Sequence, residues 1–200
     1  MKHTLLYLLI FPLFLSAQNH ETIEIGSQAP MMDVKMRATD GVDYSLSDVK
    51  NENGTLVVFS CNTCPFVVMW EDRYVMLEEI CEQNNVGMIY VNSNENKRDQ
   101  DDSYEAMVQH SLKNDYSFPY VIDAKSALAN AFNAKTTPHV FLFNQEDALV
   151  YKGAIDDNYE SKNEVKSFFV KEAIDQLVSK TSIATKETKP VGCSIKRVRN

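Results

Sequence analysis

Apolar residues run together or recur at helical spacing in separate stretches of this chain. Residues 56–59 and 86–91 are almost continuously apolar, as in strands that are buried on both faces. Between them, apolar side chains recur every three or four residues from 64 to 82, which predicts a well-buried helix. Strand, helix and strand in this order predict a βαβ unit with parallel strands and a right-handed crossover.

Weaker patterns predict the remaining elements. Residues 32–36 alternate between apolar and polar, and Asp40-Gly41 forms a turn before 42–46, so a β-hairpin is expected there. Asp102 and Glu105 resemble a capping box that opens a helix ending near Leu112. Further elements are expected as a strand at 119–122, a helix at 124–132, a hairpin over 140–143 and 148–152, and a helix at 164–179. This order predicts an α/β fold in which a central mixed sheet lies between helices.

The N-terminus has the pattern of a secretory signal peptide. Lys2 precedes an apolar run over 5–15, and small residues follow at Ser16 and Ala17. The run is shorter than the ~20 residues of a membrane-spanning helix. We therefore expect a signal peptide at 1–17, a folded domain at 18–180 and a polar, loosely held tail at 181–200. The mature protein would be periplasmic in a Gram-negative bacterium and otherwise secreted, without stable membrane insertion; the alternative is a buried strand or an anchor helix.

Length and charge restrict the function further. The chain has 200 residues, of which 44% are hydrophobic, and this suits one globular domain. Its formal charge is −8, and removal of 1–17 takes away one cation, Lys2, and no anion, which gives −9. An acidic domain is a poor candidate for binding nucleic acid or an anionic membrane.

The spacing of the cysteines indicates which chemistry the protein performs. The chain has four cysteines, namely Cys61, Cys64, Cys81 and Cys193. Cys61 and Cys64 lie where the first buried strand ends and the long helix begins, and the first helical turn has free N–H groups that stabilise a thiolate. We expect Cys61 to be the nucleophile of thiol–disulfide exchange and Cys64 the resolving cysteine. A structural disulfide, a zinc site and chance placement in the core are the alternatives, although a zinc site would need a second ligand pair at suitable spacing.

Thr137-Pro138 is the second sequence feature that indicates a functional site, because Pro138 lies just before the apolar run 140–143, where a strand is expected to begin. A proline at a strand entrance is either an ordinary edge proline or a cis proline in a tight turn. His139 would be the metal ligand if the cysteine pair bound copper, but a histidine in a strand is more often simply packed. We expect no metal and no organic cofactor.

Together these features resemble the thioredoxin fold, and the N-terminal hairpin resembles its redoxin branch, the alkyl hydroperoxide reductase and thiol-specific antioxidant group. The peroxiredoxin-like thioredoxin family proteins are most similar. The resemblance covers about residues 24–196, and it is carried by the stretches Phe59-Ser60-Cys61-Asn62-Thr63-Cys64-Pro65-Phe66-Val67, Val91-Asn92-Ser93-Asn94, Thr137-Pro138, Phe141-Leu142-Phe143, Gly153-Ala154-Ile155-Asp156-Asp157-Asn158 and Gly192-Cys193-Ser194-Ile195-Lys196.

The resemblance implies a cis Thr137–Pro138 bond that packs against the cysteine pair and binds an extended substrate segment by strand addition. It implies a thiol–disulfide oxidoreductase that acts on protein thiols and disulfides with an unidentified redox partner. The alternatives are a peroxiredoxin-like peroxidase and a non-catalytic binding module with a structural disulfide.

The chain departs from the family patterns at three places. Peroxiredoxins have a Thr three residues and a Pro seven residues before the peroxidatic Cys, and counted from Cys61 these positions hold Val58 and Gly54. Thioredoxins have a buried acid in the strand before the pair, and 55–60 contains none. We therefore expect slow peroxide chemistry, with Asp156, Asp157 or a water as the proton acceptor.

The other candidates are weaker. Cys81 shares the apolar face of the long helix and is expected to be a buried core thiol. Cys193 is either a third redox thiol that the tail returns to the site or an unpaired tail thiol. The acidic loop at 156–158 is expected to be a turn, with a cation-binding or catalytic loop as the alternative, and His20 and His110 are expected at the surface.

Overall fold

The computed structural model describes residues 23–198. The signal peptide expected at 1–17 and its cleavage site after Ala17 lie outside the described residues. His20 lies outside them as well. No helix formed by residues 23–198 combines the length and the hydropathy that a bilayer-spanning segment requires.

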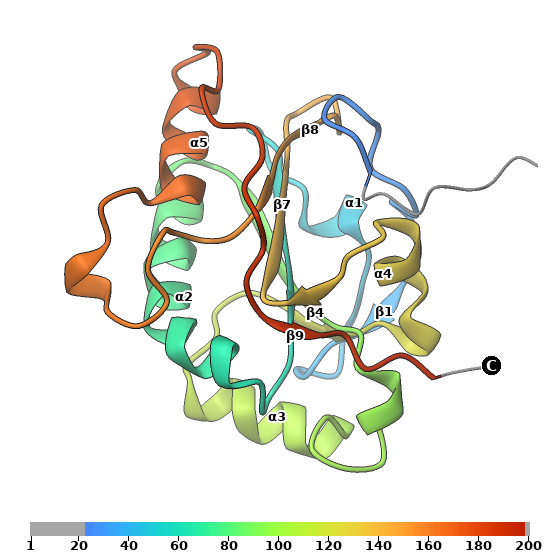
Figure 1. The fold of residues 1–200 in the computed structure, drawn as a ribbon. Helices are drawn as coiled ribbons and strands as arrows, with labels where there is room; N and C mark the ends of the chain where they lie inside the picture. Colours follow the sequence, from blue (N-terminus) through green and yellow to red (C-terminus); the bar gives the residue numbers. More distant parts are fainter. Residues whose placement is uncertain (1–22, 199–200) are drawn as a thin grey trace, which may run out of the picture.

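A five-stranded mixed sheet forms the centre of the fold (Figure 1). Its strands lie in the order β5 (Tyr120–Ile122), β4 (Gly87–Asn92), β3 (Thr55–Ser60), β7 (His139–Phe143) and β8 (Leu149–Gly153). Strands β3, β4 and β5 are parallel, whereas β7 is antiparallel to β3 and β8 is antiparallel to β7. The expected α/β architecture is confirmed, and the predicted strands are present with small shifts at their ends.

The central βαβ unit forms as the apolar runs predict. Helix α2 (Pro65–Gln83) connects β3 to β4, and Val57 pairs with Ile89 in the parallel ladder. Every residue of both strands is buried. A strand buried on both faces needs apolar side chains at consecutive positions, which is why neither strand alternates in the sequence.

Successive side chains of β3 point into two different cores. Leu56 and Val58 belong to the core beneath α2 and α5 (Phe169–Val178), which also contains Trp70, Tyr74, Leu77 and Cys81. Val57 and Phe59 belong to the core on the other face, which also contains Phe132, Phe141 and Phe143. The sheet therefore holds two apolar layers together, and its β3–α2 junction lies in the middle of the fold.

The smaller elements differ more from the sequence-based expectation. The hairpin is short, with β1 (Met36–Arg37) and β2 (Asp43–Tyr44), and it is followed by an unpredicted helix α1 (Leu46–Val49). Helix α3 (Tyr104–Lys113) is capped by Ser103, whose side chain accepts from the N–H of Ala106. The capping box predicted at Asp102 is therefore wrong, because the Asp102 side chain is buried in another network.

The last two predicted helices are shorter than expected. The first is α4 (Ala127–Ala131), preceded by the 3₁₀ turn η2 (Ala124–Ser126). The expected start of the last helix near 164 falls in the 3₁₀ turn η3 (Lys162–Glu164), and α5 begins later. A third 3₁₀ turn, η1 (Glu95–Lys97), follows β4.

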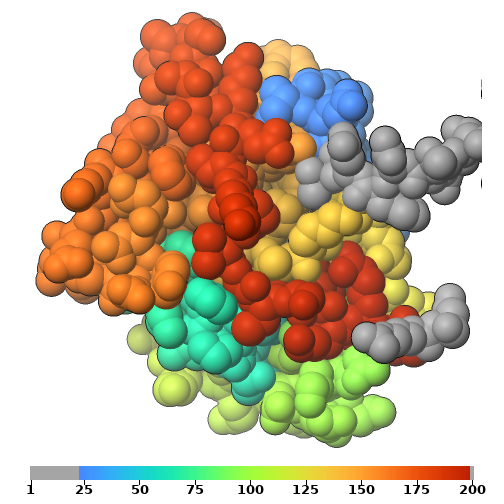
Figure 2. Space-filling view, viewed as in Figure 1, coloured from blue at the N-terminus to red at the C-terminus, as the bar shows by residue number. Residues whose placement is uncertain are grey.

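The segment after α5 is folded onto the domain, so the expectation of a loosely held tail is wrong. It first runs beside β8, where Lys152 forms a parallel bridge with Glu187. It then forms β9 (Cys193–Ser194), which pairs antiparallel with β6 (Thr136–Thr137). Figure 1 shows this red segment crossing the front of the sheet, and Figure 2 shows it lying against the turquoise start of α2.

Candidate active site

The two expected catalytic cysteines lie at the junction of β3 and α2. Cys61 directly follows the last residue of β3, and Cys64 is the N-cap of α2. Pro65 opens the helix, where its missing N–H costs nothing. The residues Cys61 and Cys64 are 2% and 5% exposed, so both are shielded from water.

The Thr137–Pro138 bond is cis, as predicted, and Thr137 contacts both thiols. Its hydroxyl oxygen lies 3.2 Å from the sulfur of Cys61. In its thiol form, Cys64 donates to the carbonyl oxygen of Thr137 over 3.1 Å. The structure thus brings the two sequence signals together at one site, and all four cysteines of the chain are free thiols.

Hydrogen-bond donors gather around Cys64. The thiol of Cys61 donates to the sulfur of Cys64, and this bond lowers the pKa of Cys64 most. The thiol of Cys193 and the N–H groups of Val67 and Cys193 lower it further. Since the N–H of Val67 belongs to the first turn of α2, Cys64 is the thiol that the helix N-terminus stabilises.

Cys61 has the opposite environment. Its hydrogen bond to Cys64 and its burial raise its pKa, and the negative charge of Asp102 raises it further. These contacts lower the pKa of Cys64 and raise that of Cys61, the reverse of the sequence-based expectation that Cys61 carries the thiolate. Part of the reason is geometric, because Cys64 is the N-cap of α2 and the N–H of Val67, in the first helical turn, is one of the groups that lower its pKa.

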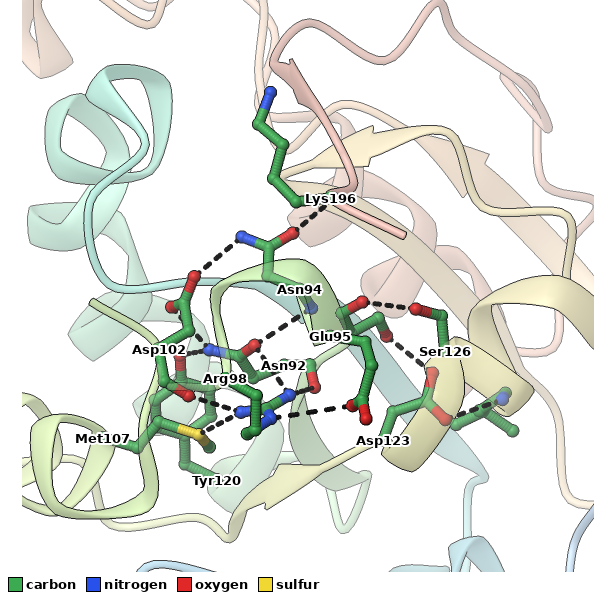
Figure 3. A network of polar contacts seen from close by, with 12 residues as sticks. Asn92, Asn94, Glu95, Arg98, Asp102, Met107, Tyr120, Asp123, Ser126 and Lys196 are labelled. Atoms are coloured by element: carbon green, nitrogen blue, oxygen red, sulfur yellow. Dashed lines mark hydrogen bonds and ion pairs between the residues drawn. The ribbon is translucent and has the colours of Figure 1, made fainter. Parts of the chain in front are cut away.

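A buried carboxylate that the sequence analysis missed supports the loop between the cysteines. Asp102 is fully buried, and its Oδ1 accepts from the N–H of Asn62 over 2.9 Å and from Nδ2 of Asn92 over 2.8 Å. Its Oδ2 accepts from Nδ2 of Asn94 over 2.9 Å, as Figure 3 shows. The signal in the sequence was the Asn-Ser-Asn stretch at the end of β4, where polar residues follow a buried strand.

Asp156 is held by α2 and not by the cysteines. Its Oδ1 accepts from Nε1 of Trp70 over 2.9 Å, and its Oδ2 accepts from Nε of Arg73 over 3.2 Å. Its Oδ1 also accepts from the N–H of Asn158, which confirms the expected turn. Among the described residues, neither Asp156 nor Asp157 hydrogen-bonds to Cys61 or Cys64. These contacts do not support the predicted role of Asp156 or Asp157 as the proton acceptor.

The remaining candidates are accounted for by packing. Cys81 is fully buried, as expected, and burial raises the pKa of its thiol. His139 is buried beside Phe141, and burial and nearby lysines lower its pKa to about 3, so its imidazole is neutral. His110 is not the surface residue that we expected, because it is mostly buried and its Nε2 lies 2.9 Å from Oε1 of Glu71.

No group of three or more His, Cys, Asp or Glu side chains that could hold a metal ion occurs within the part of the chain that the structure describes. A groove of about 660 Å³ lies away from the thiols, between the ends of β8 and α5, and no Cys or His lines it. The chemistry that the described residues offer is therefore concentrated in the thiols.

Cys193 lies next to Cys64. Its N–H and its thiol contribute to the lowered pKa of Cys64, and the N–H of Phe66 acts to lower the pKa of Cys193 itself. Its backbone pairs with that of Thr137. Of the two readings that the sequence left open, the structure favours a thiol that belongs to the site.

Comparisons with known proteins agree with this fold. The family described as Redoxin matches residues 24–168. An uncharacterized conserved protein from Geobacillus kaustophilus is 30% identical, with a TM-score of 0.82 over 88% of this chain and 94% of that one. A hypothetical protein from Sinorhizobium meliloti is 26% identical, with a TM-score of 0.82 over 90% and 98%.

A thiol:disulfide interchange protein of the DsbE type from Chlorobium tepidum shares the fold at 14% identity, with a TM-score of 0.58 over 80% of this chain and 98% of that one. No curated protein sequence matches the chain.

Proposed function

The chain belongs to the Redoxin family of thiol redox proteins, and we propose that it is an exported thiol–disulfide oxidoreductase that exchanges disulfides with protein partners through Cys61 and Cys64. The observation that supports this proposal most directly is the meeting of both thiols with Thr137 at the start of α2. A structural cysteine pair does not require thiolate-stabilising donors, whereas a nucleophile does.

The environments of the two cysteines suggest their roles. The Cys64 thiolate attacks one sulfur of a partner disulfide, a Cys64–partner bond forms, and the other partner sulfur leaves as a thiolate. Cys61 then attacks the sulfur of Cys64, its proton goes to a departing partner thiolate, and a Cys61–Cys64 disulfide remains. Two electrons pass to the partner, and the reverse sequence oxidises a partner dithiol.

A peroxidase is the less supported alternative. Counted from Cys61, the Thr and Pro positions of a peroxiredoxin hold Val58 and Gly54; counted from Cys64, they hold Cys61 and Val57. Gly54 has a φ of +119°, and a Cβ there would lie 2.0 Å from the carbonyl oxygen of Phe143, so proline does not fit. Neither register supplies the hydroxyl that orients a peroxide.

The reduction potential of the cysteine pair tests the proposal. We expect a value above about −300 mV, because an exchange-active disulfide is more easily reduced than a structural one. Equilibration with dithiothreitol or glutathione buffers, followed by mass spectrometry of the alkylated thiols, measures it. Turnover of insulin disulfides should accompany this potential. A potential well below −300 mV together with no insulin turnover would favour the structural disulfide, and a peroxide rate constant near ~10⁸ M⁻¹s⁻¹ would favour the peroxidase.

Export is part of the proposal and has its own test. The charged start, the short apolar run and the small residues at 16–17 support a cleaved signal peptide. We expect the mature protein to begin at Gln18, and N-terminal sequencing of the exported protein checks this. Recovery of the full-length chain from the cytoplasm alone would contradict export.

A further inference from the structure

The C-terminal segment pairs with β6, the strand edge to which an extended peptide partner would bind. Strand β9 pairs antiparallel with β6, with Cys193 opposite Thr137 and Ser194 opposite Thr136. Thr137 is also the residue that contacts both catalytic thiols. An extended partner segment that brings a cysteine to Cys64 by strand addition would use the same backbone groups of β6.

Specific contacts fasten the end of this segment. Ile195 is buried, and its N–H donates to the carbonyl oxygen of Lys135 over 3.1 Å. The Arg197 guanidinium donates to the carbonyl oxygen of Ala134 over 2.6 Å and to Oδ1 of Asn130 over 2.7 Å. The segment is therefore held by directional bonds to residues that precede β6, although it has few apolar side chains.

The same segment is connected to the loop between the cysteines. The N–H of Lys196 donates to Oδ1 of Asn94 over 2.8 Å, and Nδ2 of Asn94 donates to Asp102 (Figure 3). Asp102 in turn accepts from the N–H of Asn62, which lies between Cys61 and Cys64. The docked segment and the cysteine loop thus share one buried polar network.

Gly192 allows the close approach of the segment. A Cβ at this position would lie 2.2 Å from the carbonyl oxygen of Thr137, closer than any side chain tolerates. Since that contact is with backbone, a substitution at Gly192 has to move β9 away from β6. The glycine is followed by Cys193, which pairs with Thr137, and Thr137 in turn contacts Cys64.

We propose that the C-terminal segment 192–197 is a tethered pseudosubstrate: it fills the strand-addition edge at Thr136–Thr137 and presents Cys193 to Cys64, and it must leave before a protein partner can dock. This inference rests on the proposed function and adds its regulation. A partner reaches the thiols only when it displaces β9, so the tail lowers the rate with protein disulfides more than the rate with small disulfides.

The geometry also assigns a chemical step to Cys193. In the oxidised protein, the Cys193 thiol loses its proton and its sulfur attacks the sulfur of Cys64. The Cys61–Cys64 bond breaks, a Cys64–Cys193 bond forms, and Cys61 leaves as a thiolate that takes up the proton. No electrons are gained or lost, so this isomerisation needs no external oxidant.

A crosslinking experiment tests the chemical step without any protein partner. Cys61→Ser is treated with glutathione disulfide at neutral pH, and its disulfides are mapped by peptide mass spectrometry. Cys64 displaces one glutathione thiolate, and Cys193 then displaces the second, so we expect an internal Cys64–Cys193 disulfide. The matched control, Cys61→Ser with Cys193→Ser, should stop at one glutathione adduct. A stable glutathione adduct on Cys64 in the first variant would overturn the assignment of Cys193.

A second experiment tests the blocked edge. Gly192→Ala should raise the rate of insulin disulfide reduction several-fold while it changes the rate with a small aromatic disulfide much less. Lys189→Ala is the control, because this side chain is exposed on the same segment. Arg197→Ala, which removes anchoring bonds without touching Thr137, should act in the same direction as Gly192→Ala.

The two proposals fail in different ways. If neither wild type nor Gly192→Ala exchanges with insulin, the proposed function is wrong, and the crosslinking result still decides whether Cys193 reacts with Cys64. If wild type is active and both Gly192→Ala and Arg197→Ala leave the insulin rate unchanged or lower it, the pseudosubstrate is wrong.

Discussion

Replacement of Cys64 by serine is expected to slow thiol–disulfide exchange by about a hundredfold at pH 6–7. The thiolate is the attacking species, and the donors around Cys64 lower its pKa. In Cys64→Ser the remaining thiol at this junction is Cys61. It loses its hydrogen bond to Cys64, the largest cause of its raised pKa, but burial and the charge of Asp102 still raise its pKa. Cys61→Ser combined with Cys193→Ser should keep most of the rate of the first attack, because serine at 61 can still donate to the sulfur of Cys64. It should accumulate a mixed disulfide, because it lacks both thiols that could resolve one.

The pH dependence of the wild-type rate gives a second measure of the same assignment. An ordinary thiol, with a pKa of ~8.5, loses about tenfold in rate for each unit that the pH falls below this value. Because the pKa of Cys64 is lowered, its thiolate persists as the pH falls, and the rate should change by less than about tenfold between pH 8 and pH 6. Stopped-flow kinetics with an aromatic disulfide, in a Cys193→Ser background that removes the neighbouring thiol, measure both effects.

Two outcomes would reverse the roles of the cysteines. One is a rate that keeps rising tenfold per pH unit up to pH 8. The other is a mixed disulfide that, in the Cys193→Ser background, accumulates in Cys64→Ser and not in Cys61→Ser. Either result would restore Cys61 as the nucleophile.

The central sheet was predictable because its strands bury both faces. A short, continuous apolar run is typical of a strand that is buried on both faces of a sheet. The βαβ order then predicts a right-handed crossover between parallel strands. The two parts of the site were also visible, since Cys61-x-x-Cys64 and Thr137-Pro138 both stand at strand ends. Their proximity followed from the family resemblance, because no spacing in the sequence relates residues so far apart in the chain.

Which of the two cysteines has the lowered pKa was not predictable from their positions in the sequence alone. It depends on where the helix starts within one residue, and sequence patterns do not define helix ends that accurately. It depends also on the N–H and thiol of Cys193, which arrive from the other end of the chain. The donors at Cys64 are thus largely a product of tertiary structure.

The docked tail was missed for a related reason. Hydrophobic periodicity reveals segments that bind through side chains, but β9 binds through its backbone and through single polar contacts such as Lys196 with Asn94. Asp102 was misassigned because an acid three residues before a glutamate matches a helix cap, and only burial distinguishes a cap from a network. Buried polar residues that hydrogen-bond to one another do not recur at a regular spacing, so periodicity in the sequence does not reveal them.

Replacement of Arg73 by methionine is expected to lower the free energy of unfolding by about 3–5 kcal/mol, because it leaves the buried carboxylate of Asp156 without its cationic partner. The side chains of Arg73 and Asp156 are 3% and 0% exposed, and their ion pair joins α2 to the loop after β8. Asp156→Asn should also destabilise the protein, since the guanidinium then loses its buried counter-ion and keeps only its ion pair with the exposed Asp72. Urea denaturation of the reduced protein at neutral pH measures both changes.

The same variants separate a structural role of Asp156 from a catalytic one. If Asp156 only holds α2, Asp156→Asn should keep the wild-type rate of thiol–disulfide exchange at temperatures where it is folded. Asp157→Asn is the matched control, because Asp157 is exposed and should change the stability by no more than about 0.5 kcal/mol. A destabilisation of Arg73→Met below ~1 kcal/mol would show that the ion pair contributes little. A large loss of exchange rate in folded Asp156→Asn would show that Asp156 acts on the thiols, either as a proton acceptor or by positioning the first turns of α2 through Trp70.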